Sequence, residues 1–162
     1  MSAEAHKQLI ERFYTAFGQK DGHGMAQCYA SDVHFSDPVF PDLSGPRAGA
    51  MWDMLTQAPG DLRIELIDHD ADEKHGSAHW RAHYVFSETG RPVVNDVHAE
   101  FRFEDGVITD HHDDFDFHRW ARQALGPVGL LLGWTPMLRS AVRRKAAARL
   151  EQHTGVAAES RH

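Results

Sequence analysis

The sequence has a single cysteine, Cys28, so no disulfide can form within the chain, which fits a reducing compartment. It also lacks a long apolar run, since the most apolar stretch, residues 126–134, is far too short to span a bilayer. Residues 1–7 are polar and contain no apolar segment of the kind found in secretory signals. We therefore expect a cytoplasmic protein with no stable membrane association.

Positive charge is scarce as well, because 17 Lys and Arg face 24 Asp and Glu, a net charge of -7. Nucleic-acid binding needs an excess of positive charge, so nucleic acid is not an expected partner. The basic residues near the C-terminus form one group: Arg139, Arg143, Arg144, Lys145 and Arg149. A solvated helix face explains this group better than a binding patch does. The apolar stretch before it, with these basic residues, could touch a membrane surface. We expect it instead to cover the open end of a pocket or to form an oligomer contact.

Patterns typical of metal sites are also absent, although the chain has 13 histidines. No His-x-x-x-His pair falls on an expected helix, and there is no cysteine cluster. Successive side chains of a strand point to opposite faces, so His111, His112 and Asp113 cannot all bind one ion. We predict no metal and no cofactor.

What the sequence does contain predicts a single domain of helices followed by strands. Apolar residues at helical spacing predict a helix over residues 3–18, and Asp21 can cap a short second helix with Met25, Cys28 and Tyr29 on one face. A strand over residues 33–37 follows. Pro46 suits the first turn of a third helix, whose apolar stripe is Ala48, Met51, Trp52 and Leu55.

From residue 62 onward the chain alternates apolar and polar residues, which is the period of a strand. Thr89-Gly90 predicts a two-residue hairpin loop. On the largely apolar face the pairs that follow are Phe86–Val93, Tyr84–Asn95, Ala82–Val97, Trp80–Ala99 and Ala78–Phe101. On the other face His83 meets Asp96 and His79 meets Glu100, so this register satisfies both faces.

A second hairpin is expected at residues 104–106, with Gly106 in the left-handed region of a three-residue loop. This register places Ala99 opposite His111 and Val97 opposite Asp113. It also leaves Asp96 opposite Asp114, which is an unfavourable pair. A two-residue turn would instead turn Phe115 and Phe117 toward solvent.

The two registers bring His111 and Asp113 to the inner face of the sheet, beside alanines 78, 82 and 99. Small side chains in the middle of a curved sheet leave space, so we expect a pocket there. Its expected walls are Phe13, Trp52, Trp80, Tyr84 and Ala99. A carboxylate in such surroundings suits acid–base chemistry near neutral pH. Asp113 is therefore a candidate acid or base with His111 as its partner, and a buried structural pair is the alternative.

The order of elements carries a family resemblance. Two helices, a strand that ends in Asp37-Pro38, a third helix and a meander that ends in Phe-Arg-Phe-Glu-Asp-Gly resemble the nuclear transport factor 2-like superfamily over about residues 5–120. That superfamily includes SnoaL-like polyketide cyclases, ketosteroid isomerases, limonene epoxide hydrolases and scytalone dehydratases.

The resemblance implies an α+β fold with a cone-shaped, curved antiparallel sheet packed against N-terminal helices. It implies a domain over residues 1–125, and we expect residues 126–162 to form a helical extension. Many members dimerise through the outer sheet face, so a homodimer is expected.

Site residues carry over only in part. Ser36-Asp37-Pro38-Val39 resembles the isomerase segment that holds the proton-shuttling carboxylate, which implies that Asp37 is a base. The two oxyanion donors of the isomerases would fall on Phe13 and Ala99, with Tyr14 rotated away. The acidic residue of the epoxide hydrolases falls on Asp113, while its partners fall on Trp80 and Ala82. The cyclases use an acidic residue in the same region.

We therefore expect an enzyme that moves protons on a small apolar molecule, as an isomerase, cyclase, dehydratase or hydrolase. The alternative is a non-catalytic ligand-binding or dimerisation module of the same fold, because one fold hosts many functions.

Overall fold

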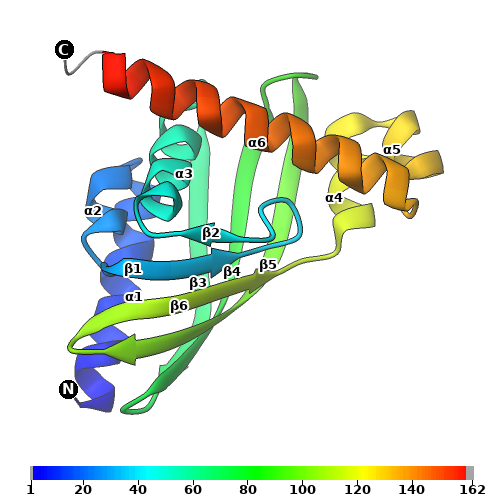
Figure 1. Cartoon of the computed structure of the whole chain (residues 1–162). Coiled ribbons are helices and arrows are strands. Elements are labelled where there is room, and N and C mark those ends of the chain that lie inside the picture. The colour runs from blue at the N-terminus through cyan, green and yellow to red at the C-terminus, as the bar shows by residue number, and fades with distance from the viewer. Residues whose placement is uncertain (1, 160–162) are drawn as a thin grey trace.

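The computed structural model describes residues 2–159 and the side chains through residue 155 (Figure 1). Its helices are α1 (Ala3–Gly18), α2 (Gly22–Ala26), α3 (Pro46–Gln57), α4 (Phe117–Leu125), α5 (Pro127–Leu132) and α6 (Pro136–Glu159). Its strands are β1 (Tyr29–Ser36), β2 (Leu43–Ser44), β3 (Leu62–Ala71), β4 (His75–Phe86), β5 (Arg91–Glu104) and β6 (Val107–Asp114).

The strands form one curved sheet in the order β2-β1-β6-β5-β4-β3 (Figure 1). Strands β3 to β6 make an antiparallel meander, whereas β1 runs parallel to β6. The core lies between the inner face of the sheet and the helices, and it includes Phe13 of α1, Met51 of α3 and Leu150 of α6, each 0% exposed. The expected α+β fold is confirmed.

The N-terminal helices begin where the sequence predicts, although α2 ends at Ala26 and does not reach Cys28 and Tyr29. The hydroxyl of Ser2 accepts a hydrogen bond from the backbone N–H of Ala5 at 3.1 Å, which caps α1. The Asp21 carboxylate likewise accepts from Gly24 N–H at 2.9 Å and caps α2. Pro46 occupies the first turn of α3. Leu55, in the predicted apolar stripe of α3, is 42% exposed and, like Trp52, borders a cavity on the inner side of the sheet.

The predicted register of the first hairpin is wrong by two residues. Tyr84 faces Val93 and Trp80 faces Val97, and the loop has four residues, 87–90. Gly90 N–H donates to Phe86 O at 2.8 Å and closes this loop. Because side chains alternate with a period of two, a slip of two residues leaves every side chain on its predicted face. The inner face is therefore as expected, although the partners differ.

The second hairpin has the two-residue turn that the sequence argued against. Asp105 and Gly106 have φ values of +51° and +79°, as a tight hairpin turn with two left-handed residues requires. A β-bulge follows, because the register shifts between Ile108 and Asp110. The extra residue restores the alternation, so His111 faces Phe101 and Asp113 faces Ala99. Both side chains remain on the inner face.

The corrected register also removes the unfavourable pair of aspartates. Asp114 faces His98 instead of Asp96. Asp96 lies opposite Arg81 and not opposite His83, and His79 lies opposite His98 and not opposite Glu100.

Helix α6 lies across the open side of the sheet (Figure 1). Arg143 Nε donates to the backbone oxygen of Pro38 at 2.9 Å, in the loop after β1. Arg149 and Lys145 form ion pairs with Glu88, in the β4–β5 loop. These contacts fix α6 to two loops at the rim of the sheet. Among the described residues, no helix is both long and apolar enough to cross a membrane.

Candidate functional site

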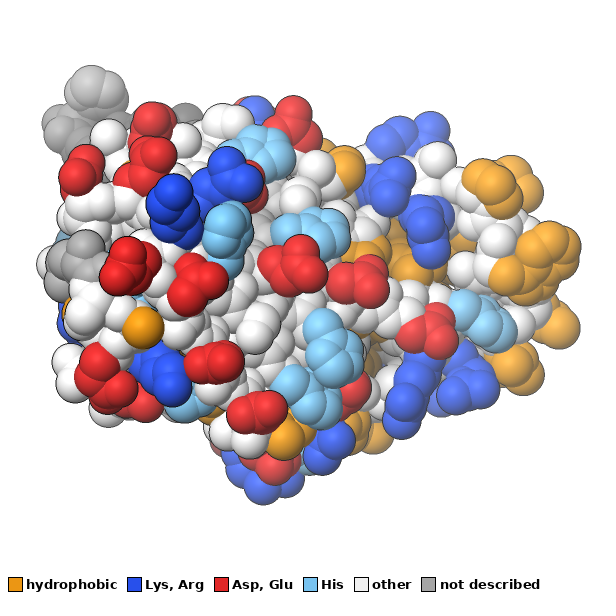
Figure 2. Space-filling model, turned by 90° about the horizontal axis from the view of Figure 1, so that it is seen from below, with side chains coloured by type: hydrophobic (Ala, Val, Ile, Leu, Met, Phe, Trp, Pro, Cys, Tyr) orange, Lys and Arg blue, Asp and Glu red, His pale blue; other side chains and the backbone are white. Residues whose placement is uncertain are grey.

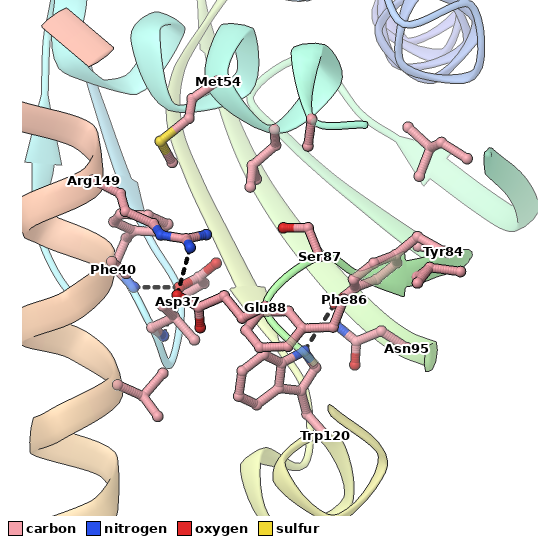
Figure 3. A pocket seen from close by; sticks show the side chains of 18 of the residues that line it. Asp37, Phe40, Met54, Tyr84, Phe86, Ser87, Glu88, Asn95, Trp120 and Arg149 are labelled. Carbon is pink, nitrogen blue, oxygen red and sulfur yellow. Dashed lines mark hydrogen bonds and ion pairs between the residues drawn. The ribbon is translucent and has the colours of Figure 1, made fainter. Parts of the chain in front are cut away.

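A cavity of about 780 Å³ lies between the inner face of the sheet and helices α3 and α6 (Figure 3). Its walls are mainly apolar, as expected for a small-molecule site. Three of the predicted wall residues line it: Trp52, Trp80 and Tyr84. Both candidate carboxylates, Asp37 and Asp113, line the same cavity.

The other predicted wall residues, Phe13 and Ala99, are buried in the core and are not among the residues that line the cavity. The ring of Phe13 packs at 5.4 Å from that of His111. The ring of Tyr14 packs against Trp80 at 5.6 Å and against Phe101 at 6.4 Å. Ala99 belongs to the same buried core cluster as these rings, so core side chains fill the space beside it.

Asp113 is 2% exposed and extends from β6 toward the cavity. Its Oδ1 atom accepts a hydrogen bond from His111 Nε2 at 2.8 Å and a long one from Trp80 Nε1 at 3.5 Å. Both donors therefore approach one oxygen. His111, in contrast, is 0% exposed and does not line the cavity.

His111 belongs to a chain of hydrogen bonds. Trp52 Nε1–H donates to Tyr29 Oη at 2.8 Å. Tyr29 Oη is hydrogen-bonded in turn to His111 Nδ1 at 2.7 Å. In the tautomer whose proton lies on Nε2, His111 donates to Asp113 and its Nδ1 atom accepts from the Tyr29 hydroxyl. Burial, with the charge of Asp113 adding to it, raises the pKa of Tyr29 well above its usual value, so the hydroxyl stays protonated.

Sequence reasoning missed Tyr29, because it assigned this residue to the face of the second helix. In the structure Tyr29 begins β1, which pairs with β6. A parallel neighbour 82 positions away leaves no local signal in the sequence.

Asp37 lies in the loop after β1, where its Oδ1 atom accepts backbone N–H bonds from Val39 at 2.7 Å and from Phe40 at 2.5 Å (Figure 3). Burial raises its pKa from 3.8 to about 7. The charge of Asp113 acts in the same direction, whereas the two N–H groups and Arg143 oppose the rise. The two carboxylates thus affect each other electrostatically across the cavity.

Comparison with protein families now assigns the fold, because residues 10–111 match the model of the SnoaL-like domain. The chain belongs to the SnoaL-like domain family. No curated protein matches its sequence significantly.

Several solved structures share the fold of this SnoaL-like domain. An LEH-like epoxide hydrolase from M. tuberculosis superposes with a TM-score of 0.65 at 19% identity, over 80% of this chain and 97% of that one. A proposed polyketide cyclase from Xanthomonas campestris gives 0.66 at 21% identity, over 75% and 97%. A protein with a ketosteroid isomerase-like fold from Catenulispora acidiphila, in complex with trimethylamine, gives 0.65 at 15% identity, over 79% and 97%. At these identities the likeness shows the fold alone.

Two tyrosines of the SnoaL-like domain add hydroxyl groups near the site. Tyr84 Oη accepts from Trp120 Nε1 at 2.8 Å (Figure 3), and burial raises its pKa to about 12. Tyr14, one residue from the position to which the resemblance assigns an oxyanion donor, is 3% exposed and does not line the cavity. Its hydroxyl has no hydrogen-bond partner in the part of the chain that the structure describes. Burial, with the Asp113 charge second, raises the pKa of Tyr14 well above its usual value.

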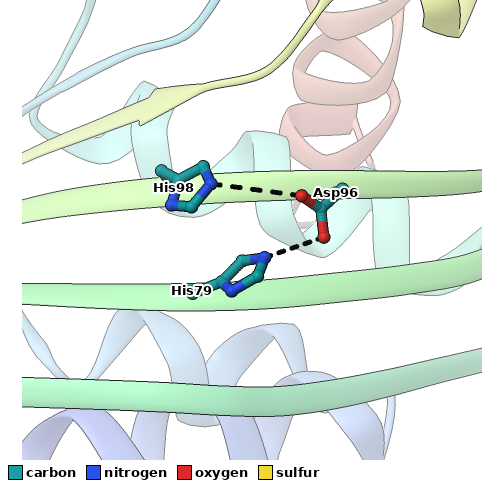
Figure 4. Close-up of side chains that lie close together, drawn as sticks. All are labelled: His79, Asp96 and His98. Atoms are coloured by element: carbon teal, nitrogen blue, oxygen red, sulfur yellow. Dashed lines mark hydrogen bonds and ion pairs between the residues drawn. The ribbon is translucent and has the colours of Figure 1, made fainter.

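One group of potential metal ligands lies on the outer face of the sheet: His79, Asp96 and His98 (Figure 4). Their ligand atoms lie within 4.8 Å of one another, and two imidazoles with a carboxylate are a chemically suitable set for Zn²⁺. Arg81 Nη2, 3.3 Å from Asp96 Oδ1, opposes a second cation there. Sequence reasoning overlooked this group, because its register separated His79 from His98. The group faces away from the cavity.

Proposed function

We propose that this SnoaL-like domain is an acid–base enzyme that acts on a small, largely apolar molecule. The observation that carries the proposal is the pair of carboxylates, Asp37 and Asp113, in the wall of one apolar cavity. Asp37, with a pKa of about 7, is present in both protonation states near neutral pH. That is the property required of a group that both removes and returns a proton.

In this proposal Asp37 exchanges a proton with the substrate or with a water molecule beside it. Asp113 is the second carboxylate, and its Oδ2 atom faces the reacting group while Oδ1 holds the bonds from His111 and Trp80. His111 is a positioning residue, since it lies behind Asp113 and reaches the cavity only through that side chain. Phe13 and Ala99 then act through packing.

The walls set the class of substrate. Trp52, Trp80 and Tyr84 present aromatic surface, and Tyr84 also offers a hydroxyl to a polar group of the substrate. Two of the proteins that share the fold are an LEH-like epoxide hydrolase and a proposed polyketide cyclase, and small-molecule chemistry of this kind is consistent with the proposal.

A proton-exchange assay tests the proposal directly. In D₂O the protein should accelerate the uptake of deuterium at the α-carbon of an enolisable apolar ketone such as β-tetralone, followed by NMR. Asp37→Asn and Asp113→Asn should each lower the catalysed rate by roughly 10²–10⁴-fold. Asp32→Asn, at an exposed carboxylate of β1, is the matched control and should leave the rate unchanged.

The proposed enzymatic function would be contradicted if the protein binds β-tetralone but neither exchanges the α-protons of this ketone nor opens styrene oxide. That result would favour the non-catalytic ligand-binding module, for which both Asn variants keep the affinity of the wild type.

The homodimer through the outer sheet face, the cytoplasmic location and the division into residues 1–125 and 126–162 stay predictions. Sedimentation of the purified protein tests the first of them.

A further inference from the structure

The surface around α5 has an unusual concentration of exposed apolar side chains. We call this surface the apolar tip, and it consists of Val128, Leu130, Leu131, Leu132, Trp134 and Met137. Leu131, Trp134 and Met137 are 68%, 73% and 71% exposed. Figure 2 shows hydrophobic side chains gathered at one end of the molecule, next to Lys and Arg side chains. A contiguous apolar surface with a charged border is typical of an interaction site.

Three polar groups in and beside the apolar tip donate hydrogen bonds to backbone oxygens of the same segment. Trp134 Nε1–H donates to Leu131 O at 3.0 Å, and the Thr135 hydroxyl donates to Leu132 O at 2.6 Å. Gly133 N–H donates to Gly129 O at 2.8 Å. Burial of an unpaired hydrogen-bond donor costs free energy. A surface whose donors are already paired therefore loses little free energy when it enters an apolar medium.

Charge separates the apolar tip from the rest of the chain. Residues 117–150 contain seven Arg and Lys and no Asp or Glu, whereas the whole chain has a net charge of -7. Arg139 and Arg122 lie on the segments that border the tip. Exposed Leu and Trp beside Arg and Lys are the combination that binds at the surface of anionic bilayers. Two copies joined tip to tip would bring two positive segments together, which favours lipid over self-association.

The apolar tip also adjoins the cavity. Val128 of α5 and Leu138 of α6 line the cavity, while Leu131, Trp134 and Met137 point to solvent. We propose that the apolar tip docks reversibly on the surface of a membrane that contains anionic phospholipid. An apolar substrate dissolved in that membrane then lies close to the cavity wall. This last step rests on the proposed function, whereas the docking itself does not.

Flotation with vesicles tests the docking. The protein should float with vesicles of phosphatidylglycerol and phosphatidylcholine, bind less well to phosphatidylcholine alone, and be released by salt. The double variant Leu131→Ser, Trp134→Ser should weaken binding by at least about tenfold, because two apolar side chains no longer leave water. Ile67→Ser is the matched control, since Ile67 is a 44% exposed apolar residue of β3 and should not affect binding.

Three results would overturn the docking. In the first, the wild type does not float with the anionic vesicles at low salt. In the second, the double variant floats as well as the wild type. In the third, neither protein binds vesicles, and the wild type is a dimer whereas the double variant is a monomer. Asp37→Asn and Asp113→Asn should float like the wild type. Proton exchange without flotation therefore refutes the docking alone, and flotation without exchange refutes the proposed enzyme alone.

Discussion

Replacing Asp37 by Asn should stabilise the protein, and by an amount that grows with pH. The folded protein holds the proton of Asp37 up to about pH 7, whereas the unfolded chain releases it near the ordinary pKa of 3.8. The carboxyl group therefore contributes its full stability only below about pH 4, and this contribution is lost as the pH rises to about 7. Asn carries no charge at any of these pH values, and its oxygen can still accept the bonds from Val39 and Phe40.

The size of the effect follows from the difference in pKa. Each unit corresponds to about 1.4 kcal/mol, so ionised Asp37 lowers the free energy of unfolding by up to about 4 kcal/mol above pH 7. At about pH 5 only the first part of this loss has occurred, about 1.5 kcal/mol. The free energy of unfolding of the Asn variant should exceed that of the wild type by these amounts. The difference is smaller to the extent that water still hydrates the partly exposed Asp37 carboxylate in the folded protein.

Urea denaturation at about pH 5 and about pH 8 measures both differences. Asp32→Asn controls for the loss of one negative charge, because Asp32 is an exposed residue of β1. The reasoning is refuted if the advantage of Asp37→Asn is the same at both pH values, or if this variant is less stable than the wild type at the higher one.

Three further substitutions test the interior. His111→Ala should lower the free energy of unfolding by about 3–5 kcal/mol in urea, because Tyr29 and Asp113 lose their partner; a loss below about 1 kcal/mol would disprove the hydrogen-bond chain. Tyr14→Phe should raise it by about 1 kcal/mol, since it removes a buried hydroxyl without a partner, and a decrease would contradict this. Gly129→Ala should lower it by about 1–3 kcal/mol, because a Cβ would lie 1.9 Å from the Ala121 oxygen; Gly155→Ala, in open space, should not lower it.

The fold could be predicted from the sequence where local patterns decide it. Helical spacing, the cap at Asp21 and the first-turn proline Pro46 define the N-terminal helices, and strict alternation defines the two faces of each strand. Loop length was not readable, since Thr89-Gly90 occurs at the end of a four-residue loop as well as in a two-residue one. The error did not affect the faces, because it amounted to two residues.

The residues of the candidate site could likewise be predicted only where local patterns decide their position. The inward position of Asp113 could be predicted from alternation along β6. This alternation places its side chain on the inner face of the sheet, whichever residue of β5 lies opposite. Tyr29 and Trp52 could not be connected to Asp113, since their contacts depend on how β1 and α3 pack against the sheet. The same limit applies to Ala99, which is buried in the core cluster and does not border the space that the sequence assigned to a ligand.

Because α6 supplies a whole wall of the cavity from one continuous stretch of chain, that wall can be remodelled without disturbing any strand pairing. Ala141 and Ala146 face the cavity from this helix, and larger residues there would narrow it while Asp37 and Asp113 stay in place. Exchange of a single helix therefore offers a short route, in evolution or in protein engineering, from one ligand preference to another.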